Sequence, residues 1–310
     1  MSVLFAFPGQ GAQRSGMLHA LPDHGETRCA IEEASDALGY DALTLDSAGA
    51  LRSTVAVQLC LLIAGVAQAR VLSACDSEPD MVTGLSIGAY PAAVIAGALS
   101  YADAVRLVAL RGQLMETAYP RGYGMTAIVG IAQRAMERLI AQVNSPAMPV
   151  FLANINAETQ MVVAGSDAAM QRLAELASEG GAQRCERLDV AVPSHCALLD
   201  APAAALAEAF SRVAMRAPRL VYLSSSVARP LFDGPRIAAD LAGNMALQVR
   251  WHDTARLAWE RGARLAVEMP PANVLTRLNS AIFADGIAVS CSDTALPDLV
   301  ALVERERALL

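Results

Sequence analysis

The stretch Val82-Thr83-Gly84-Leu85-Ser86-Ile87-Gly88-Ala89-Tyr90 places one serine between two glycines. The residues before it, 80–83, are predicted to form a strand, and the alanine-rich residues after it a helix. A G-x-S-x-G pentad between a strand and a helix is typical of a sharp turn that exposes the serine hydroxyl at the helix N-terminus. Such a pentad also occurs by chance, so a small residue in a tight turn is the plainer interpretation. Ser86 is therefore a candidate nucleophile, and the amide of Ile87 would point into the same space and stabilise an oxyanion.

The length and composition predict an ordinary globular protein. A chain of 310 residues with 54% hydrophobic content is long enough for about two domains with a full-sized core. The formal charge of −7 and the lack of a basic run argue against nucleic-acid binding. The first residues carry no basic leader, and the longest apolar stretch, 55–69, is shorter than a membrane helix. We expect a cytoplasmic protein without a membrane segment, in which residues 55–69 form a buried helix.

Two residue types limit the chemistry. The six cysteines are scattered without a C-x-x-C pair or a histidine tract, which predicts reduced thiols and no metal site. All 24 cationic side chains are arginine, because the sequence contains no lysine. A pyridoxal Schiff base and a phosphate loop ending in Gly-Lys-Ser/Thr both need a lysine amine, so both are excluded.

The order of the expected strands and helices predicts one α/β domain interrupted by a second unit. Residues 3–7 are predicted as a strand that ends in the glycine turn Pro8-Gly9-Gln10-Gly11-Ala12-Gln13, and helical periodicity then dominates to about residue 72. The order β-α-β-β-α-β, typical of a ferredoxin-like unit, follows for strands at 125–131, 149–156, 161–164 and 184–190 and helices at 133–143 and 167–178. We therefore predict a subdomain at 125–191 inserted between the two parts, 1–124 and 192–310, of a larger α/β domain. The larger domain is predicted to resume with a helix at 201–212, a strand at 219–224, a helix at 253–261 and a strand at 264–268.

A serine nucleophile needs a base, and the sequence offers four histidines. His19, His24 and His252 stand in polar surroundings typical of solvated side chains. His195 lies in Val192-Pro193-Ser194-His195-Cys196, just past the insert, where the chain turns from strand to helix. An isolated histidine is more often structural, but the shortage of alternatives favours His195 as the base.

Arg111 is predicted to point into the protein. In a helix over 101–118, its neighbours three and four residues away are all apolar: Leu107, Val108, Leu114 and Met115. A buried guanidinium is costly unless an anion meets it. That anion is either a distant Asp or Glu in a buried ion pair, or a substrate carboxylate held by the bidentate fork.

These motifs together resemble the malonyl-CoA:acyl carrier protein transacylases. The resemblance rests on residues 7–13, the pentad at 84–88, Arg111 in Leu110-Arg111-Gly112, Asn154-x-Asn156 and Val192-Pro193-Ser194-His195, in the family's order. It implies an α/β-hydrolase-like core carrying a ferredoxin-like subdomain. It also implies that malonyl-CoA acylates Ser86, with His195 as base and then acid, and that the malonyl group passes to the phosphopantetheine-type thiol of an acyl carrier protein. No permanently bound cofactor or metal is implied.

The resemblance assigns further roles to matching positions. The backbone amides of Gln10 and Ile87 would form the oxyanion hole, and Arg111 would hold the malonyl carboxylate. The backbone carbonyl of Arg250 would orient His195. The remaining substrate-binding positions are Met115, Asn154 and Asn156, although strand-end asparagines are also common in turns.

Some positions depart from the family pattern. Leu85 stands where histidine is usual, Ala89 where glutamate is usual, and Met269-Pro270-Pro271 where Gly-Pro-Gly is usual. The segment Gly-Leu-Ser-Ile-Gly-Ala-Tyr-Pro is most similar to the transacylase (epsilon) subunit of malonate decarboxylase, which implies that complex's own carrier subunit as partner. The alternatives are a transacylase of fatty-acid or polyketide synthesis, a serine hydrolase or thioesterase, and a non-catalytic carrier-binding module.

Overall fold

Two β-sheets organise the chain in a computed structural model that describes residues 2–119, 121–190 and 192–308. The larger sheet has the strand order β10-β9-β1-β2-β7-β8, in which neighbouring strands are parallel except for β8 at one edge. Its strands are β1 (Ser2–Phe7), β2 (Met81–Gly84), β7 (Val221–Ser224), β8 (Arg229–Leu231), β9 (Ala263–Glu268) and β10 (Ile287–Ser290). The α/β class predicted from the sequence is therefore confirmed.

Both faces of the larger sheet are covered by helices. Along β1, Val3, Phe5 and Phe7 join the main core, whereas Leu4 joins a second cluster on the other face. Strands buried on both faces read as continuous apolar runs, which explains residues 3–7. On the main-core side lie α1 (Gly25–Leu38), α2 (Thr54–Ala74), α3 (Ala89–Ile95), α4 (Tyr101–Ala118), α7 (Asp200–Phe210), α8 (Gly234–Gly243) and α11 (Leu296–Ala308). On the other side lie α9 (Trp251–Glu260) and α10 (Val274–Ser280).

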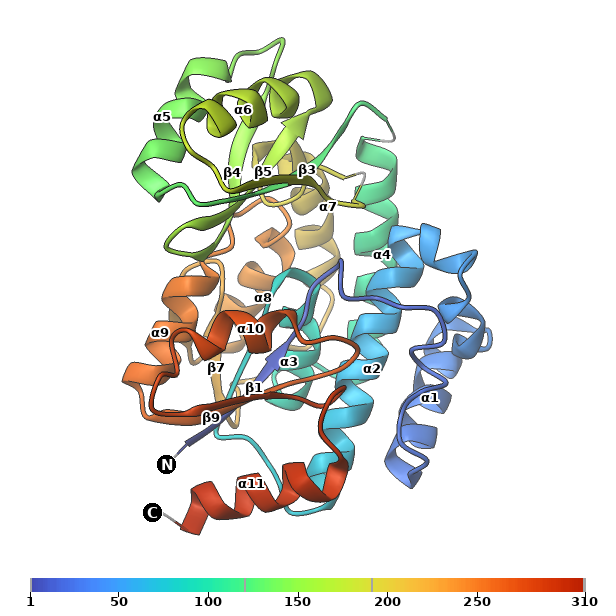
Figure 1. Cartoon of the computed structure of the whole chain (residues 1–310). Coiled ribbons are helices and arrows are strands. Elements are labelled where there is room, and N and C mark those ends of the chain that lie inside the picture. Colours follow the sequence, from blue (N-terminus) through green and yellow to red (C-terminus); the bar gives the residue numbers. More distant parts are fainter. Residues whose placement is uncertain (1, 120, 191, 309–310) are drawn as a thin grey trace.

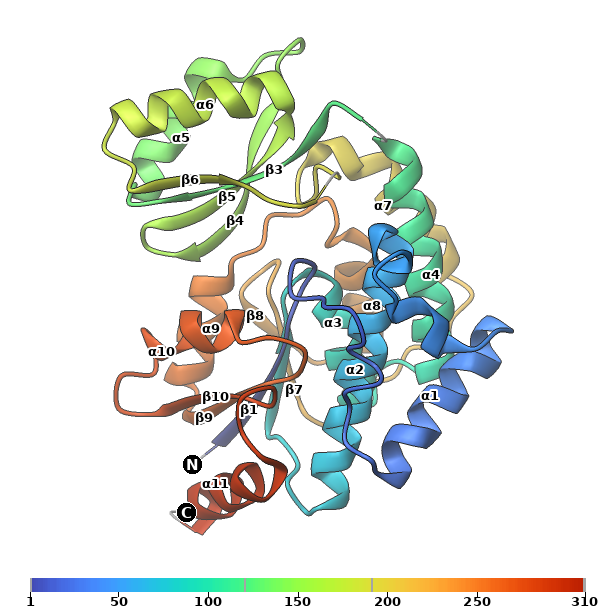
Figure 2. The ribbon, with the colours of Figure 1, turned by 45° about the vertical axis from the view of Figure 1, so that its right-hand side comes forward.

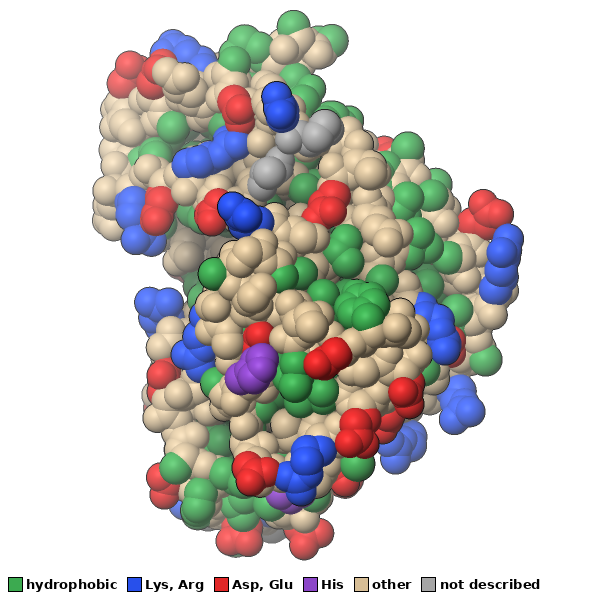
Figure 3. Space-filling view, turned by 90° about the vertical axis from the view of Figure 1, so that its right-hand side faces the viewer, with side chains coloured by type: hydrophobic (Ala, Val, Ile, Leu, Met, Phe, Trp, Pro, Cys, Tyr) green, Lys and Arg blue, Asp and Glu red, His purple; other side chains and the backbone are tan. Residues whose placement is uncertain are grey.

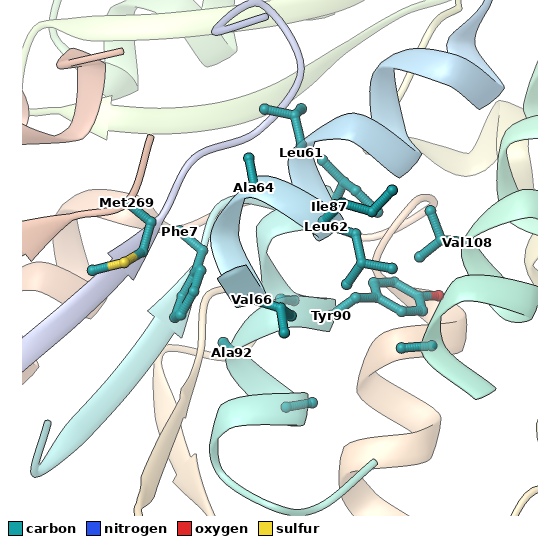
Figure 4. Packing of buried hydrophobic residues seen from close by; sticks show 14 of the residues in the cluster. Phe7, Leu61, Leu62, Ala64, Val66, Ile87, Tyr90, Ala92, Val108 and Met269 are labelled. Carbon is teal, nitrogen blue, oxygen red and sulfur yellow. The ribbon is translucent and has the colours of Figure 1, made fainter. Parts of the chain in front are cut away.

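Helix α2 is the central helix of the main core. By length and composition it would be able to cross a membrane, but 89% of its most apolar window is buried inside the protein. Leu62 and Val66 lie in one cluster with Tyr90 and with Ile87, the residue that follows the candidate nucleophile in the sequence (Figure 4). The buried helix predicted at 55–69 is thus confirmed, and it packs against the segment that carries Ser86.

The inserted segment forms the smaller sheet, at the top of Figure 1. Its element order is β3 (Tyr123–Val129), α5 (Gln133–Val143), β4 (Val150–Ala157), β5 (Gln160–Ser166), α6 (Asp167–Glu179) and β6 (Arg184–Arg187), in an antiparallel sheet of order β4-β5-β3-β6. Helices α5 and α6 cover its outer face, and its other face is turned towards the larger sheet (Figure 2). The predicted succession of strands and helices is present.

The last strand of the insert is shorter than predicted. β6 ends at Arg187 instead of residue 190, because the chain leaves the sheet there and leads into the segment that carries His195. Val190 and Cys196 pack together against the inner face of the smaller sheet. Residue 191, the predicted end of the insert, and residues 1 and 310, the predicted ends of the larger domain, lie outside the described residues.

The described surface carries mixed charge. On the face drawn in Figure 3, acidic and basic side chains are interspersed, and neither sign forms a continuous area. Most described ion pairs join exposed side chains close in sequence, such as Arg250 with Asp253. Exposed pairs of this kind contribute little to stability, so burial of apolar side chains carries most of it.

Candidate active site

Ser86 lies at a sharp elbow between β2 and α3. A short 3₁₀ turn, Ser86–Gly88, connects them, and Ser86 has φ 56°, in the left-handed region that a non-glycine residue rarely adopts. A Cβ on Gly84 would lie 1.9 Å from the carbonyl carbon of Gly88, so only glycine fits at that position. The glycines of the pentad therefore allow the chain to fold back on itself while the serine is held at the turn.

The loop after β1 packs directly against this elbow. The Leu85 amide donates to the Phe7 carbonyl at 2.9 Å, and a Cβ on Gly88 would lie 2.1 Å from that same carbonyl oxygen. A Cβ on Gly9 would lie 2.6 Å from a methyl carbon of Leu85. The loop that contains Gln10 thus lies against the segment that carries Ser86 and Ile87, which supports the predicted use of both backbone amides at one site.

His195 lies beside Ser86, although the two are far apart in sequence. Its Nε2 is 2.9 Å from the Ser86 Oγ, and the residue is 4% exposed. Its Nδ1 lies 2.8 Å from the Asn244 carbonyl and 3.1 Å from the Leu247 carbonyl. Carbonyl oxygens only accept, so the proton belongs on Nδ1, and the unprotonated Nε2 is left to accept the serine proton.

The predicted role of Arg250 is wrong. The Arg250 carbonyl accepts from the amide and hydroxyl of Thr254 at the start of α9, and its guanidinium pairs with Asp253. Its carbonyl is therefore committed to the first turn of α9, and it is not among the partners of His195. The carbonyls of Asn244 and Leu247, in the segment that joins α8 to Val249, orient His195 in its place.

The surroundings of His195 favour its neutral form. Burial, followed by the positive charge of Arg111, lowers the pKa of His195 from 6.5 to about 4. The hydrogen bonds to the carbonyls of Asn244 and Leu247 act in the opposite direction but are outweighed. A neutral imidazole at physiological pH is the form that a general base requires.

Arg111 is fully buried in α4 and points at the nucleophile. Its Nη2 donates to the Ser86 Oγ and to the Asn244 Oδ1, both at 3.2 Å, and its guanidinium carbon lies 5.9 Å from the ring centre of Tyr90. Its Nε has no hydrogen-bond partner, and within the described ranges no carboxylate forms an ion pair with it. Burial lowers the pKa of the Arg111 guanidinium below the ordinary value for arginine. The sequence left two interpretations for Arg111, an internal ion pair or a substrate carboxylate. The described residues do not form the internal ion pair.

The Ser86 hydroxyl therefore has a donor on one side and an acceptor on the other. It accepts from Arg111 and donates to Nε2 of His195. This arrangement directs the serine proton to the imidazole and places a positive charge beside the oxygen that loses it.

The other predicted substrate-binding residues lie near these elements without a described hydrogen bond to the serine. Met115 is one turn after Arg111 in α4, and its sulfur accepts from the amide nitrogen of Gln58 at 3.3 Å. Asn154 and Asn156 are buried in β4, and their Oδ1 atoms have no partner in the described part of the chain. The backbone of β4 pairs with Val249, which ties the insert to the segment that orients His195.

Sequence reasoning missed Asn244 and Leu247. An asparagine just after a helix is common as a cap, and a backbone carbonyl has no sequence signature, so neither position carried a readable signal. The three histidines set aside are elsewhere: His19 is mostly exposed and pairs with Asp46, and His24 caps α1. His252 lies in α9 and is partly buried, so the solvated position predicted for it is wrong. Over the described ranges, no group of three or more His, Cys, Asp or Glu side chains is placed to hold a metal ion.

The comparisons with known proteins agree on an acyltransferase. Residues 4–305 match the family described as the acyl transferase domain. The chain belongs to this family, within the malonyl-CoA:acyl carrier protein transacylases. It is 37% identical over 298 residues to the malonyl CoA-acyl carrier protein transacylase of Haemophilus influenzae, covering 93% of this chain and 95% of that protein. The corresponding Escherichia coli protein is 36% identical, with 90% and 92% covered.

Solved structures give the same result. The malonyl CoA-acyl carrier protein transacylase of Coxiella burnetii superposes with a TM-score of 0.93 at 31% identity, covering 98% of each chain. A malonyl-transacylase solved in complex with its type II PKS acyl-carrier protein superposes with a TM-score of 0.91 at 33% identity, covering 98% of this chain and 100% of that one. The relatives named here are transacylases, and none of them is described as a malonate decarboxylase subunit.

Proposed function

We propose that this protein is an [acyl-carrier-protein] S-malonyltransferase that moves a malonyl group from malonyl-CoA to the phosphopantetheine-type thiol of an acyl carrier protein. The observation that carries the proposal is the buried Arg111 guanidinium, which is 3.2 Å from the Ser86 hydroxyl and has no described internal carboxylate. A buried cation beside an activated serine suits an acyl group that ends in a carboxylate. The names of the relatives support the same substrate and partner.

The first half-reaction forms the seryl ester. The Ser86 oxygen attacks the thioester carbonyl carbon while its proton passes to Nε2 of His195. The carbon–sulfur bond then breaks, and His195 returns the proton to the sulfur, so that free coenzyme A leaves. The amides of Gln10 and Ile87 stabilise the oxyanion of the tetrahedral intermediate, and Arg111 holds the malonyl carboxylate.

The second half-reaction runs the same steps with a different thiol. The carrier thiol gives its proton to His195, and its sulfur attacks the ester carbonyl. The carbon–oxygen bond breaks, the Ser86 oxygen takes the proton back, and the malonyl thioester of the carrier leaves. Met115, Asn154 and Asn156 are proposed to line the acyl and thioester positions, and no bound cofactor takes part.

We assign the two units as the family pattern implies. The larger is an α/β-hydrolase-like catalytic domain, 1–124 and 192–310, and the smaller is a ferredoxin-like subdomain, 125–191. The strand order β4-β5-β3-β6 with both helices on one face supports the second assignment. We propose a cytoplasmic location with no nucleic-acid or membrane partner.

The comparisons favour one of the predicted functions over the others. A transacylase of fatty-acid or polyketide synthesis is better supported than the malonate decarboxylase subunit, whose support is limited to the sequence around Ser86. A lipase-like hydrolase would have an apolar acyl site and an acidic residue behind the histidine, whereas His195 is held by carbonyls. A non-catalytic carrier-binding module would have no need for the aligned hydrogen bonds of Ser86.

Intact-protein mass spectrometry after incubation with malonyl-CoA tests the proposal. The unaltered protein should gain one malonyl group, and Ser86→Ala should gain none. Ser290→Ala is a matched control, because Ser290 is also buried and hydrogen-bonded but lies in β10, and it should still be acylated. An unaltered protein that gains no malonyl group, or an adduct that persists in Ser86→Ala, would contradict the mechanism. Loss of the adduct to water as fast as to an acyl carrier protein would identify a thioesterase.

A further inference from the structure

Asn244 contacts all three central residues of the site. It follows the last turn of α8 and is 3% exposed. Its backbone carbonyl accepts from His195, its Oδ1 accepts from Arg111 at 3.2 Å, and its Nδ2 donates to the Ser86 carbonyl at 3.2 Å. The main chain of Asn244 therefore contacts the base, its amide oxygen contacts the guanidinium, and its amide nitrogen contacts the turn that carries Ser86.

The chemistry of this side chain matters as much as its position. An amide oxygen accepts a hydrogen bond from a guanidinium and fixes its direction, but it carries no charge to neutralise the cation. An aspartate has almost the same shape, and at this position it would form a buried ion pair with Arg111. The guanidinium would then meet a substrate carboxylate with its charge already balanced.

The neighbouring carboxylate in α8 is hydrogen-bonded to hydroxyl groups and forms no described ion pair with Arg111. Asp240 is one turn before Asn244, and its oxygens are taken up by the Tyr222 hydroxyl at 3.0 Å and the Ser224 hydroxyl at 2.6 Å. The same helix therefore directs its carboxylate to hydroxyl groups and its amide to the guanidinium. This distribution leaves the charge of Arg111 available.

We propose that Asn244 is a positioning residue that makes the site selective for acyl groups ending in a carboxylate, because its neutral amide aims Arg111 without cancelling its charge. This inference rests on the proposed malonyl transfer. It predicts that charge at position 244, more than shape, controls the choice between malonyl and acetyl thioesters.

The test is Asn244→Asp, with kcat and KM for acylation of Ser86 measured separately for malonyl-CoA and acetyl-CoA. The kcat/KM for malonyl-CoA, divided by that for acetyl-CoA, should fall at least about tenfold, mainly through a higher KM for malonyl-CoA. The reason is that the new aspartate would neutralise Arg111 and so weaken its buried ion pair with the malonyl carboxylate. Asn279→Asp is the matched control: Asn279 is also buried and accepts a hydrogen bond, from Trp251, but it lies in α10 outside the site. This control should keep the malonyl preference even if it unfolds at a lower temperature.

A second variant separates position from charge and does not depend on the aspartate variant folding. Asn244→Ala removes the contact to Arg111, keeps the backbone carbonyl that His195 uses, and adds no charge. We expect kcat/KM to fall more for malonyl-CoA than for acetyl-CoA, by a smaller factor than in the aspartate variant. Equal losses for both thioesters, or an aspartate variant that keeps the malonyl preference, would overturn the role of Asn244 while malonyl transfer by the unaltered protein still stands. If the unaltered protein forms no malonyl ester, the proposed function itself fails, and this inference fails with it.

Discussion

The pH dependence of acylation should report the buried state of His195. Burial and the charge of Arg111 lower the pKa of His195 from 6.5 to about 4. At pH 5.5, a histidine with a pKa of about 4 is about 97% neutral, whereas one with the ordinary pKa would be about 9% neutral. We therefore expect kcat/KM for malonyl-CoA to stay nearly constant down to about pH 5 and to decline only near pH 4.

The assay is single-turnover acylation of Ser86, followed from pH 4 to 8. Because kcat/KM reports ionisations of the free enzyme, its acid limb gives the pKa of the unliganded histidine. Arg111→Leu should move that limb to higher pH, since it removes the positive charge that is the second cause of the lowered pKa. An acid limb near pH 6.5 in the unaltered protein would refute a neutral, buried His195 as the base.

The same pKa shift predicts a change in stability. Above pH 6.5 His195 is neutral in both the folded and the unfolded state, so its contribution does not change. As the pH falls from 6.5 to 4, the unfolded state binds the proton first, because the pKa of His195 is 6.5 there and about 4 in the folded protein. The free energy of unfolding therefore decreases by up to about 3 kcal/mol. Denaturant melts across this range should show a smaller loss in His195→Gln, which has no titrating ring. An equal loss in both proteins would assign the effect to other groups.

Three substitutions test the rest of the site. Arg111→Ala should lower kcat/KM for malonyl-CoA by about two to three orders of magnitude and shift preference toward acetyl-CoA, because a buried charge pair with the substrate is lost; an unchanged preference would make the arginine purely structural. His195→Ala should slow acyl transfer by about two to four orders of magnitude in stopped-flow assays, and an unchanged rate would assign the base elsewhere. Gly84→Ala should lower the free energy of unfolding by about 1–3 kcal/mol and abolish acylation, because its Cβ would lie 1.9 Å from the Gly88 carbonyl carbon. Thermal melts that match those of the unaltered protein would show that the elbow tolerates a side chain.

Local features of this site could be predicted from the sequence. The need for glycine at Gly84 is local, because its Cβ would meet the backbone of Gly88, whereas the need for glycine at Gly88 comes from the distant Phe7 carbonyl. The helical position of Arg111 followed from its apolar neighbours, and the structure buries it completely. Periodicity also predicted the helix over 133–143 with the observed bounds. Apart from the constraint on Gly88, the physical cause in each case lies within a few residues of the feature.

Features that depend on distant segments could not be predicted in this way. Every residue has a backbone carbonyl, so the sequence does not show which one meets the Nδ1 of His195, and the family position, Arg250, was the wrong choice. The role of Asn244 arises because α8, α4 and the elbow meet in space. The strand β10 and the helix α11 were not predicted. Their apolar residues are buried only because β10 pairs at the edge of the larger sheet and α11 packs against its main-core face.

Two residues of the site, Ser86 and His195, have a strained backbone conformation. Among the described residues, only four that are not glycine have a positive φ, and two of these four are Ser86 and His195. A left-handed non-glycine residue costs about 1–3 kcal/mol, and it persists only where surrounding contacts hold it. At Ser86 one contact is local, because the Gly88 amide donates to the Leu85 carbonyl, and another is distant, because the Leu85 amide donates to the Phe7 carbonyl of β1. At His195 the contact is distant: its amide donates to the Met245 carbonyl at 2.6 Å, in the segment whose neighbouring carbonyls orient the ring. The segment from Asn244 to Leu247 thus fixes both the strained backbone and the ring of His195, and the Asn244 side chain also holds the Ser86 carbonyl. A change that moves this segment should therefore disturb the base and the nucleophile together.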